Sequence, residues 1–169
     1  MRSGYPDRID DEAVIARQLG RPPLGAPAVA VRCPHGRPAV IEQPAYLADG
    51  RPFPTTYYLT CPHAVARIDA LEAAGGVDRY EQLVAADSAA GAEYRAGAAR
   101  QHELRRPAGR MADGGASLGL GIAGTSRPGA VKCLHAHAAF ALAHPDYALG
   151  CRILAEAAPI FAVQECCTP

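Results

Sequence analysis

The sequence predicts a single α+β domain, residues 1–169, in which a small antiparallel sheet of about three strands packs with several helices. The length of 169 residues lies within the usual size range of one domain. Short runs of β-branched and aromatic residues occur in the N-terminal half, where they alternate with turns rich in proline and glycine. Segments with helical periodicity fill most of the remainder. Together these patterns are typical of an α+β fold with the sheet near the N-terminus.

The first expected element is a helix over residues 12–19. Asp10 and Asp11 precede it, and Gly20 follows it. Acidic side chains interact favourably with the positive end of a helix dipole, and glycine commonly ends a helix. This segment is therefore expected to form a short helix ahead of the sheet.

A β-hairpin and a third strand are expected next. The two β-runs 28–32 and 39–42 are separated by a turn that carries Cys33 and His35. The run 55–60 is rich in β-branched and aromatic residues, which favour strands. These three runs form the predicted sheet.

Helical periodicity accounts for most of the later chain. Pro62 suits the first position of a helix because it has no N–H to leave unpaired, which makes Cys61 the residue that caps this helix. The expected helices are 63–74, 78–106 with an interruption near Gly91 or Gly97, 131–143 and 147–158.

Three segments are expected to lie outside regular structure. Residues 107–130 are rich in glycine and are predicted to form either a mobile loop or an ordered binding loop. The two ends, 1–10 and 159–169, are predicted to be flexible.

Charge and hydropathy exclude several classes of function. Seventeen basic and seventeen acidic side chains cancel, so no overall field attracts nucleic acid or an anionic membrane. No apolar run approaches the roughly 20 residues that a membrane-spanning helix needs, and the first residues lack the apolar stretch of a signal peptide. We therefore expect a cytoplasmic protein that binds neither nucleic acid nor membranes.

Cysteine and histidine are concentrated in three clusters, each at a boundary between expected elements. Disulfides are rare in the cytoplasm, so cysteines beside histidines favour a metal site or catalysis. Thiolate and imidazole are preferred ligands of zinc; four protein ligands close a structural site, whereas three leave room for water in a catalytic site. The sequence predicts one transition-metal site, with zinc as the metal and iron as the alternative. The candidate ligands are Cys33, His35, Cys61, His63, Cys133, His135 and His137.

The third cluster allows two arrangements. If the helix includes Cys133, then His137 lies four residues further on and shares its face. If the helix begins after Cys133, His135 becomes its natural neighbour. Both arrangements are consistent with the sequence.

The same clusters are also consistent with two other functions and with a purely structural role. Cys61 at a helix N-terminus could be a reactive thiolate in a cysteine-dependent enzyme or redox protein, with His63 or His135 as its base. A closed metal site could instead staple an interaction module for a protein partner. In a catalytic metal site, Glu42 or His63 could act as acid or base.

The same residues could also be ordinary structural ones. Buried cysteines pack as small apolar residues, and a core histidine can have both ring nitrogens hydrogen-bonded. Cys151, Cys166 and Cys167 are expected to be packing or tail cysteines, because the tail offers no neighbouring histidine.

Several of these motifs resemble a known family. The motifs are Arg32-Cys-Pro-His-Gly-Arg-Pro-Ala-Val-Ile-Glu42, Asp49-Gly-Arg-Pro-Phe-Pro-Thr-Thr-Tyr-Tyr-Leu-Thr-Cys-Pro-His63 and Val131-Lys-Cys-Leu-His135. They resemble the bacterial family known as domain of unknown function 501 (DUF501), over about residues 12–155. The resemblance places Cys33, Cys61, Cys133 and His135 within the family's motifs and so favours His135 over His137. Genes of this family often lie beside cell-division and exopolyphosphatase genes, which implies a cytoplasmic housekeeping role and no particular mechanism.

Overall fold

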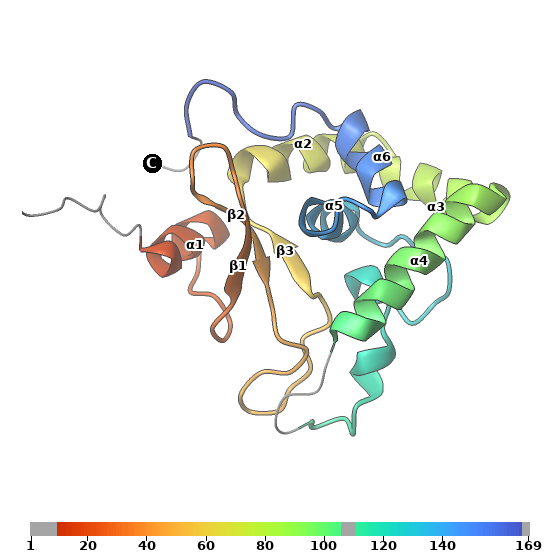
Figure 1. The fold of residues 1–169 in the computed structure, drawn as a ribbon, viewed down its shortest axis with the longest axis horizontal. Coiled ribbons are helices and arrows are strands. Elements are labelled where there is room, and N and C mark those ends of the chain that lie inside the picture. Colours follow the sequence, from red (N-terminus) through yellow and green to blue (C-terminus); the bar gives the residue numbers. More distant parts are fainter. Residues whose placement is uncertain (1–9, 106–110, 167–169) are drawn as a thin grey trace, which may run out of the picture.

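The computed structural model describes residues 10–105 and 111–166, and in that part of the chain helices surround a small sheet (Figure 1). In order, the helices and strands are α1 (Asp11–Leu19), β1 (Ala28–Arg32), β2 (Pro38–Glu42), β3 (Tyr57–Leu59), α2 (Pro62–Ala73), α3 (Gly76–Ala86), α4 (Ser88–Leu104), α5 (Leu134–Ala143) and α6 (Ala148–Glu156). Two short 3-10 turns, Ala116–Gly119 and Ile122–Gly124, lie between α4 and α5. The predicted α+β class is confirmed.

The sheet is antiparallel, with strand order β1-β2-β3. The central strand β2 is almost wholly buried, which explains its continuous apolar run Ala39-Val-Ile41. Figure 1 shows α1 on one side of the sheet and α5 on the other, so both faces of β2 are covered. The third strand β3 lies at one edge of the sheet and packs against α5.

Helix α1 begins and ends where its sequence predicts. The Asp10 carboxylate accepts a hydrogen bond from the Ala13 N–H at 3.2 Å. Gly20 ends the helix with φ of 67°, in the left-handed region that favours glycine.

The core is centred on α5, whose residues are buried on nearly every side. This helix contacts α2, α6 and β3, and its many alanines allow these elements to approach closely. A Cβ at Gly150 would lie 2.6 Å from the Ala141 Cβ, and one at Gly97 would lie 2.3 Å from the Tyr147 ring. The alanine-rich core is thus closely packed through small residues rather than loosely filled.

The helical segment expected over 78–106 is interrupted, but the expected position of the interruption is wrong. The break lies at Asp87, not near Gly91 or Gly97. The Asp87 backbone is extended, and its carboxylate accepts hydrogen bonds from the N–H groups of Ala89 and Ala90. Asp87 therefore acts as an N-cap that starts α4. Both glycines lie inside α4.

The described part of the glycine-rich segment is tied to the rest of the fold. The buried guanidinium of Arg105 donates to the carbonyls of Ser117 and Phe53 at 3.1 and 3.0 Å. The Asp113 carboxylate accepts from the Tyr46 hydroxyl at 2.7 Å and from the Ser117 N–H at 2.9 Å. Residues 111–130 thus form an ordered cover beside the 44–56 loop. Residues 107–110 of the expected loop lie outside the described residues.

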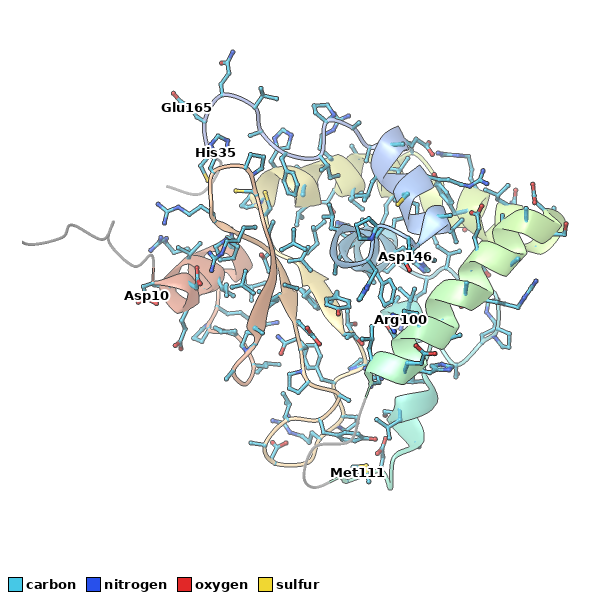
Figure 2. The ribbon with its side chains drawn as sticks, in the orientation of Figure 1. Asp10, His35, Arg100, Met111, Asp146 and Glu165 are labelled. Carbon is cyan, nitrogen blue, oxygen red and sulfur yellow. The ribbon has the colours of Figure 1, made fainter. Side chains whose placement is uncertain are left out.

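The expected flexible ends lie partly outside the described chain, which begins at residue 10 and stops at 166. Residues 159–166 run without regular structure past the β1–β2 turn (Figure 2). Among the described helices, none has the length and hydropathy needed to cross a membrane.

Candidate metal centre

Two of the predicted ligands, Cys133 and His135, lie together with a carboxylate that the sequence did not single out, Glu72. Their ligand atoms are all within 4.8 Å of one another, and no other group of three such side chains occurs among residues 10–105 and 111–166. All three residues are half-buried. The site joins the start of α5 to the C-terminal end of α2.

The start of α5 decides which histidine faces Cys133. Cys133 is the N-cap of this helix and has extended backbone, so the helix begins after it. Its sulfur lies 3.9 Å from Nδ1 of His135. Of the two arrangements left open by the sequence, the structure contains the one that pairs Cys133 with His135.

The backbone immediately before Cys133 is strained. Lys132 has φ of 54°, in the left-handed region that residues other than glycine rarely adopt. The Cys133 N–H donates to the Val131 carbonyl, which closes a tight turn. Strain of this kind costs about 1–3 kcal/mol and is found most often at functional sites.

Helix α2 supplies two carboxylates to the site. Asp69 and Glu72 are three residues apart, so they lie on one face of the helix. Nε2 of His135 lies 3.1 Å from Oδ1 of Asp69, and Nδ1 lies 3.2 Å from Oε1 of Glu72. The Glu72 oxygen also accepts the Leu134 N–H at 2.6 Å and so ties α2 to the N-terminus of α5.

These neighbours change the proton affinity of His135. Burial by itself lowers the pKa of the imidazole, but the Cys133 sulfur and the Glu72 carboxylate outweigh it and raise the pKa to about 9. Without a metal, the imidazole is therefore a cation that donates from both ring nitrogens. The side chains around His135 therefore stabilise a positive charge at this position.

The donor set and spacing suit zinc. Zinc bonds of about 2.0–2.3 Å in a tetrahedron place neighbouring ligand atoms about 3.3–3.7 Å apart. Two of the three separations are 3.9 Å from the sulfur to Nδ1 and 3.2 Å from Nδ1 to the Glu72 oxygen, and the third, from the sulfur to the Glu72 carboxylate, is within 4.8 Å. With Nδ1 on a metal, the Nε2–H would still donate to Asp69, the carboxylate support that ligating histidines usually have.

His137 is placed differently, as a core residue. It is fully buried, with Nε2 3.1 Å from the Val131 carbonyl and Nδ1 2.7 Å from the Tyr147 hydroxyl. Because a carbonyl only accepts, Nε2 carries the proton and Nδ1 accepts from Tyr147. Burial lowers the pKa of His137 to about 4, so the ring is neutral. Both ring nitrogens are engaged, as expected for a core histidine.

The two Cys-Pro-His tripeptides hold the C-terminal tail. Nε2 of His35 lies 3.0 Å from the Ala162 carbonyl, and Nε2 of His63 lies 3.2 Å from the Pro159 carbonyl. Figure 2 shows His35 beneath this tail. Cys33 and Cys61 are buried in the hydrophobic core instead. We refer to residues 158–166, which His35 and His63 contact, as the C-terminal strap.

The expected meeting of all three clusters at one point therefore needs correction. In the described structure, Cys33, Cys61, His35, His63 and His137 do not join the group formed by Glu72, Cys133 and His135. The reason is that each Cys-Pro-His turn faces the strap, whereas the start of α5 faces α2. Glu42 and His63, expected as acid or base, are also outside this group.

Sequence reasoning missed the carboxylates. Asp69 and Glu72 lie on a predicted helix whose charged residues look like an ordinary solvent-exposed face. Their spacing places them side by side, but only the packing of α2 against α5 shows that they face Cys133 and His135.

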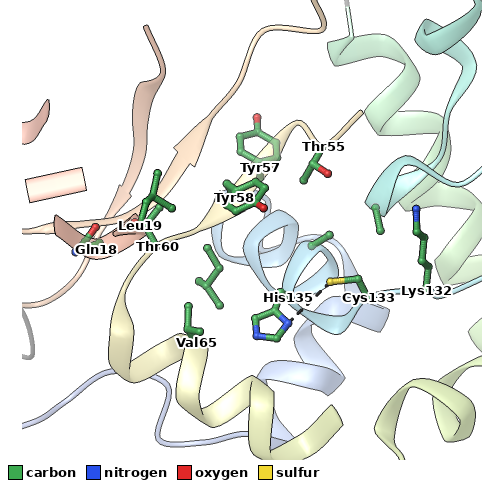
Figure 3. A pocket seen from close by; sticks show the side chains of 13 residues that line it. Gln18, Leu19, Thr55, Tyr57, Tyr58, Thr60, Val65, Lys132, Cys133 and His135 are labelled. Atoms are coloured by element: carbon green, nitrogen blue, oxygen red, sulfur yellow. Dashed lines mark hydrogen bonds between the residues drawn. The ribbon is translucent and has the colours of Figure 1, made fainter. Parts of the chain in front are cut away.

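A cleft opens beside the centre (Figure 3). It has a volume of about 500 Å³, within the usual range of small-molecule sites. Cys133 and His135 lie on its wall next to Lys132, and β3 forms the opposite side. A metal held by the centre would therefore be accessible from the cleft.

The family of the chain is shown by a match over residues 29–155 to a model described as "Protein of unknown function (DUF501)". The chain belongs to this family. The matched region of this DUF501 protein includes Glu72, Cys133 and His135, but it ends before the C-terminal strap. No curated protein and no solved structure matches the chain.

Proposed function

We propose that this DUF501 protein binds one zinc ion through Cys133, His135 and Glu72. The observation that carries the proposal is the convergence of three ligand atoms within 4.8 Å, with Asp69 in place to orient His135. A thiolate, an imidazole and a carboxylate are all zinc ligands. Glu72 replaces Cys33 and Cys61 in the ligand set predicted from sequence.

Three protein ligands leave a fourth position open, and the open side is the cleft. When bound, zinc in such a site acts as a Lewis acid and lowers the pKa of bound water. The protein's own contribution is to hold Nδ1 of His135 toward the metal through the Nε2–H bond to Asp69. The negative charges of the Glu72 carboxylate and the Cys133 thiolate would balance the two positive charges of the zinc ion. These features favour a catalytic site over a closed structural staple.

Metal analysis tests the proposal. Purified, untagged protein is expected to contain about one zinc per chain, and Cys133→Ser and Glu72→Gln are expected to lose it. Cys151→Ser is the matched control, because this cysteine is also half-buried but lies on α6, outside the group. Replacement by cobalt should give a sulfur-to-cobalt charge-transfer band that disappears in Cys133→Ser.

Two outcomes would contradict the proposal. One is wild-type protein that takes up no transition metal, and the other is Cys133→Ser protein with an unchanged zinc content. Iron as the native metal would give visible absorption in the protein as isolated, which zinc does not.

A second candidate function is a cysteine nucleophile, and one observation favours Cys133 for it. Nδ1 of His135 faces the Cys133 sulfur, while Nε2 contacts Asp69, so an imidazolium oriented by a carboxylate lies beside the sulfur, where it would stabilise a thiolate. Cys61, the earlier candidate for this role, is 2 % exposed and is poorly accessible to a substrate.

Alkylation of metal-free protein by iodoacetamide tests this candidate. If Cys133 is an activated thiolate, it reacts much faster than Cys151 near neutral pH, and Asp69→Asn slows it. Equal rates at Cys133 and Cys151 would remove the nucleophile function and leave the metal function untouched.

The cytoplasm is the proposed location, because a metal-binding thiolate persists in a reducing compartment. No particular protein partner is proposed, since the catalytic arrangement accounts for the centre without the metal-stapled interaction module.

A further inference from the structure

The cleft beside the metal centre contains features that the centre itself does not use. It is lined mainly by apolar side chains of β3, α2 and α5, and none of the described residues lining it is Asp or Glu. Its fixed positive charge comes from Lys132, which forms no hydrogen bond or ion pair with any described residue. Lys132 therefore gives this part of the wall a positive charge that can pair with an anion.

Lys132 is unusual in the sequence. It is the one lysine of the chain, whereas the other sixteen of the seventeen basic residues are arginines. Lysine carries a compact charge on a flexible stem, which suits contact with one oxyanion rather than a fixed bidentate pair. Its strained backbone holds it beside Cys133 on the cleft wall.

Backbone strain marks this cleft a second time. Among described residues other than glycine, the two with positive φ are Lys132 and Ala123, and both line the cleft. Strained residues persist where the surrounding structure requires them and are concentrated at binding and active sites. Two such positions around one cavity indicate a shaped binding site.

The far end of the cleft has an unpaired polar group. Thr60 is 2 % exposed, lines the cleft, and its hydroxyl has no hydrogen-bond partner among the described residues. Such a buried hydroxyl costs about 1–3 kcal/mol unless something pairs with it. Figure 3 shows Thr60 and Lys132 at opposite ends, with Cys133 and His135 between them.

We propose that the cleft binds a small amphipathic anion, with a carboxylate or phosphate monoester head at Lys132 and the metal centre. The apolar body of the ligand lies along Tyr58 and Val65, and a hydrogen-bonding group at its far end pairs with the Thr60 hydroxyl. This inference deepens the proposed function, on which it rests for the placement of the head beside the metal. The chemical class is an aromatic or alkyl chain with one anionic end and one polar end.

Binding of simple probes tests the inference. Hydroxyphenylpropionate, phenylpropionate, phenyl phosphate and neutral phenylpropanol are titrated calorimetrically into zinc-loaded protein. The two classes of anion are expected to bind at least about tenfold more tightly than phenylpropanol, as expected for a hydrogen bond to a charged group. Whether the carboxylates or phenyl phosphate bind more tightly identifies the natural head group.

Variants of Lys132 and Thr60 test which residue binds each end of the ligand. Lys132→Met is expected to weaken the anions about tenfold and leave phenylpropanol unchanged, whereas Lys132→Arg retains most of the affinity. Thr60→Val should preserve folding, because it removes a hydroxyl that is unpaired in the free protein. It should weaken hydroxyphenylpropionate and not phenylpropionate.

A chemical footprint gives an independent measurement. Because Lys132 is the one lysine, the reductive methylation of its side chain can be followed by peptide mass spectrometry, separately from that of the terminal α-amine. Phenylpropionate is expected to slow this modification, and phenylpropanol is not.

The inference is overturned if the anions bind no better than phenylpropanol, if none of the probes binds, or if Lys132→Met leaves anion binding unchanged. Zinc analysis of the wild-type protein, made beside the titrations, distinguishes the two proposals. Lys132-dependent anion binding by wild-type protein that takes up no metal would remove the zinc site alone. Zinc binding without any selectivity for anions would remove the ligand proposal alone.

Discussion

The chain contains the pattern Cys-x-His at two kinds of place, and the structure uses the two kinds differently. At 33–35 and 61–63 the cysteine is buried in the core and the histidine holds a carbonyl of the C-terminal strap. At 133–135 the cysteine and histidine face each other and two carboxylates of α2. The difference lies in what packs opposite each pattern. A Cys-x-His sequence becomes a candidate metal site only where another element supplies acceptors for a cation.

The largest expected effect comes from removing the sulfur at the third pattern. Cys133→Ser should lower zinc affinity by more than about 100-fold, because loss of a ligand exceeds the 10- to 100-fold effect of an outer-sphere partner. Competition with a chromogenic chelator measures this. Cys33→Ala and Cys61→Ala serve as comparisons and should lower the melting temperature while retaining zinc. Loss of zinc from either variant would return these cysteines to the ligand set.

The supporting carboxylate should have a smaller effect. Asp69→Asn is expected to weaken zinc binding about 10- to 100-fold, since an amide orients the Nε2–H of His135 less strongly than a carboxylate does. Asp78→Asn on α3 is the matched control and should bind zinc as the wild type does. If Asp69→Asn bound zinc as tightly as Asp78→Asn, Asp69 would have no role in orienting His135.

The Asp113 carboxylate, in another part of the fold, shows how accepted hydrogen bonds change the pKa of an acid. Hydrogen bonds from the Ser117 and Tyr46 hydroxyls and from the backbone hold the pKa of Asp113 well below its ordinary value of 3.8. A depressed folded-state pKa stabilises the fold above the unfolded value and loses that contribution as pH falls below it. Asp113→Asn should therefore lower the melting temperature at neutral pH, and the difference should shrink below about pH 4.

Thermal melts between about pH 7 and pH 3 measure this difference, and zinc affinity should not change. A melting-temperature difference that stayed constant across this range would show that the Asp113 charge contributes nothing.

The smallest expected effect concerns the strap. In the double variant His35→Gln, His63→Gln, the hydrogen bonds to Ala162 and Pro159 are lost or lengthened. The expected cost is about 1 kcal/mol, or about 2–4 °C in melting temperature. Amide exchange should rise in residues 159–166, and zinc binding should be unaffected. A loss of zinc in this variant would show that the patterns at 33–35 and 61–63 also support the metal centre, which contradicts the comparison above.

Local sequence signals determined much of the fold. Asp10 and Gly20 bound α1, the Pro-Gly turn between β1 and β2 forms the hairpin, and Pro62 starts α2 after Cys61. Each signal acts within a few residues, through a cap, a turn or a missing N–H, so it can be recognised without the rest of the chain. The signal for the misplaced break, which lies at Asp87, was also local. Asp87 is a typical capping residue and could be recognised in the sequence, but the prediction placed the break at the glycines that lie inside α4.

The candidate site could be predicted only in part. The sequence by itself placed Cys133 close to His135 and His137 at the start of a helix, but it left open which histidine pairs with the cysteine. Only the tertiary structure decided that Asp69 and Glu72 face them and that Cys33 and Cys61 do not. Those residues are tens of positions from Cys133, and which of them comes near it depends on how α2 packs against α5. Side-chain packing of whole helices sets that choice, and no local pattern encodes it.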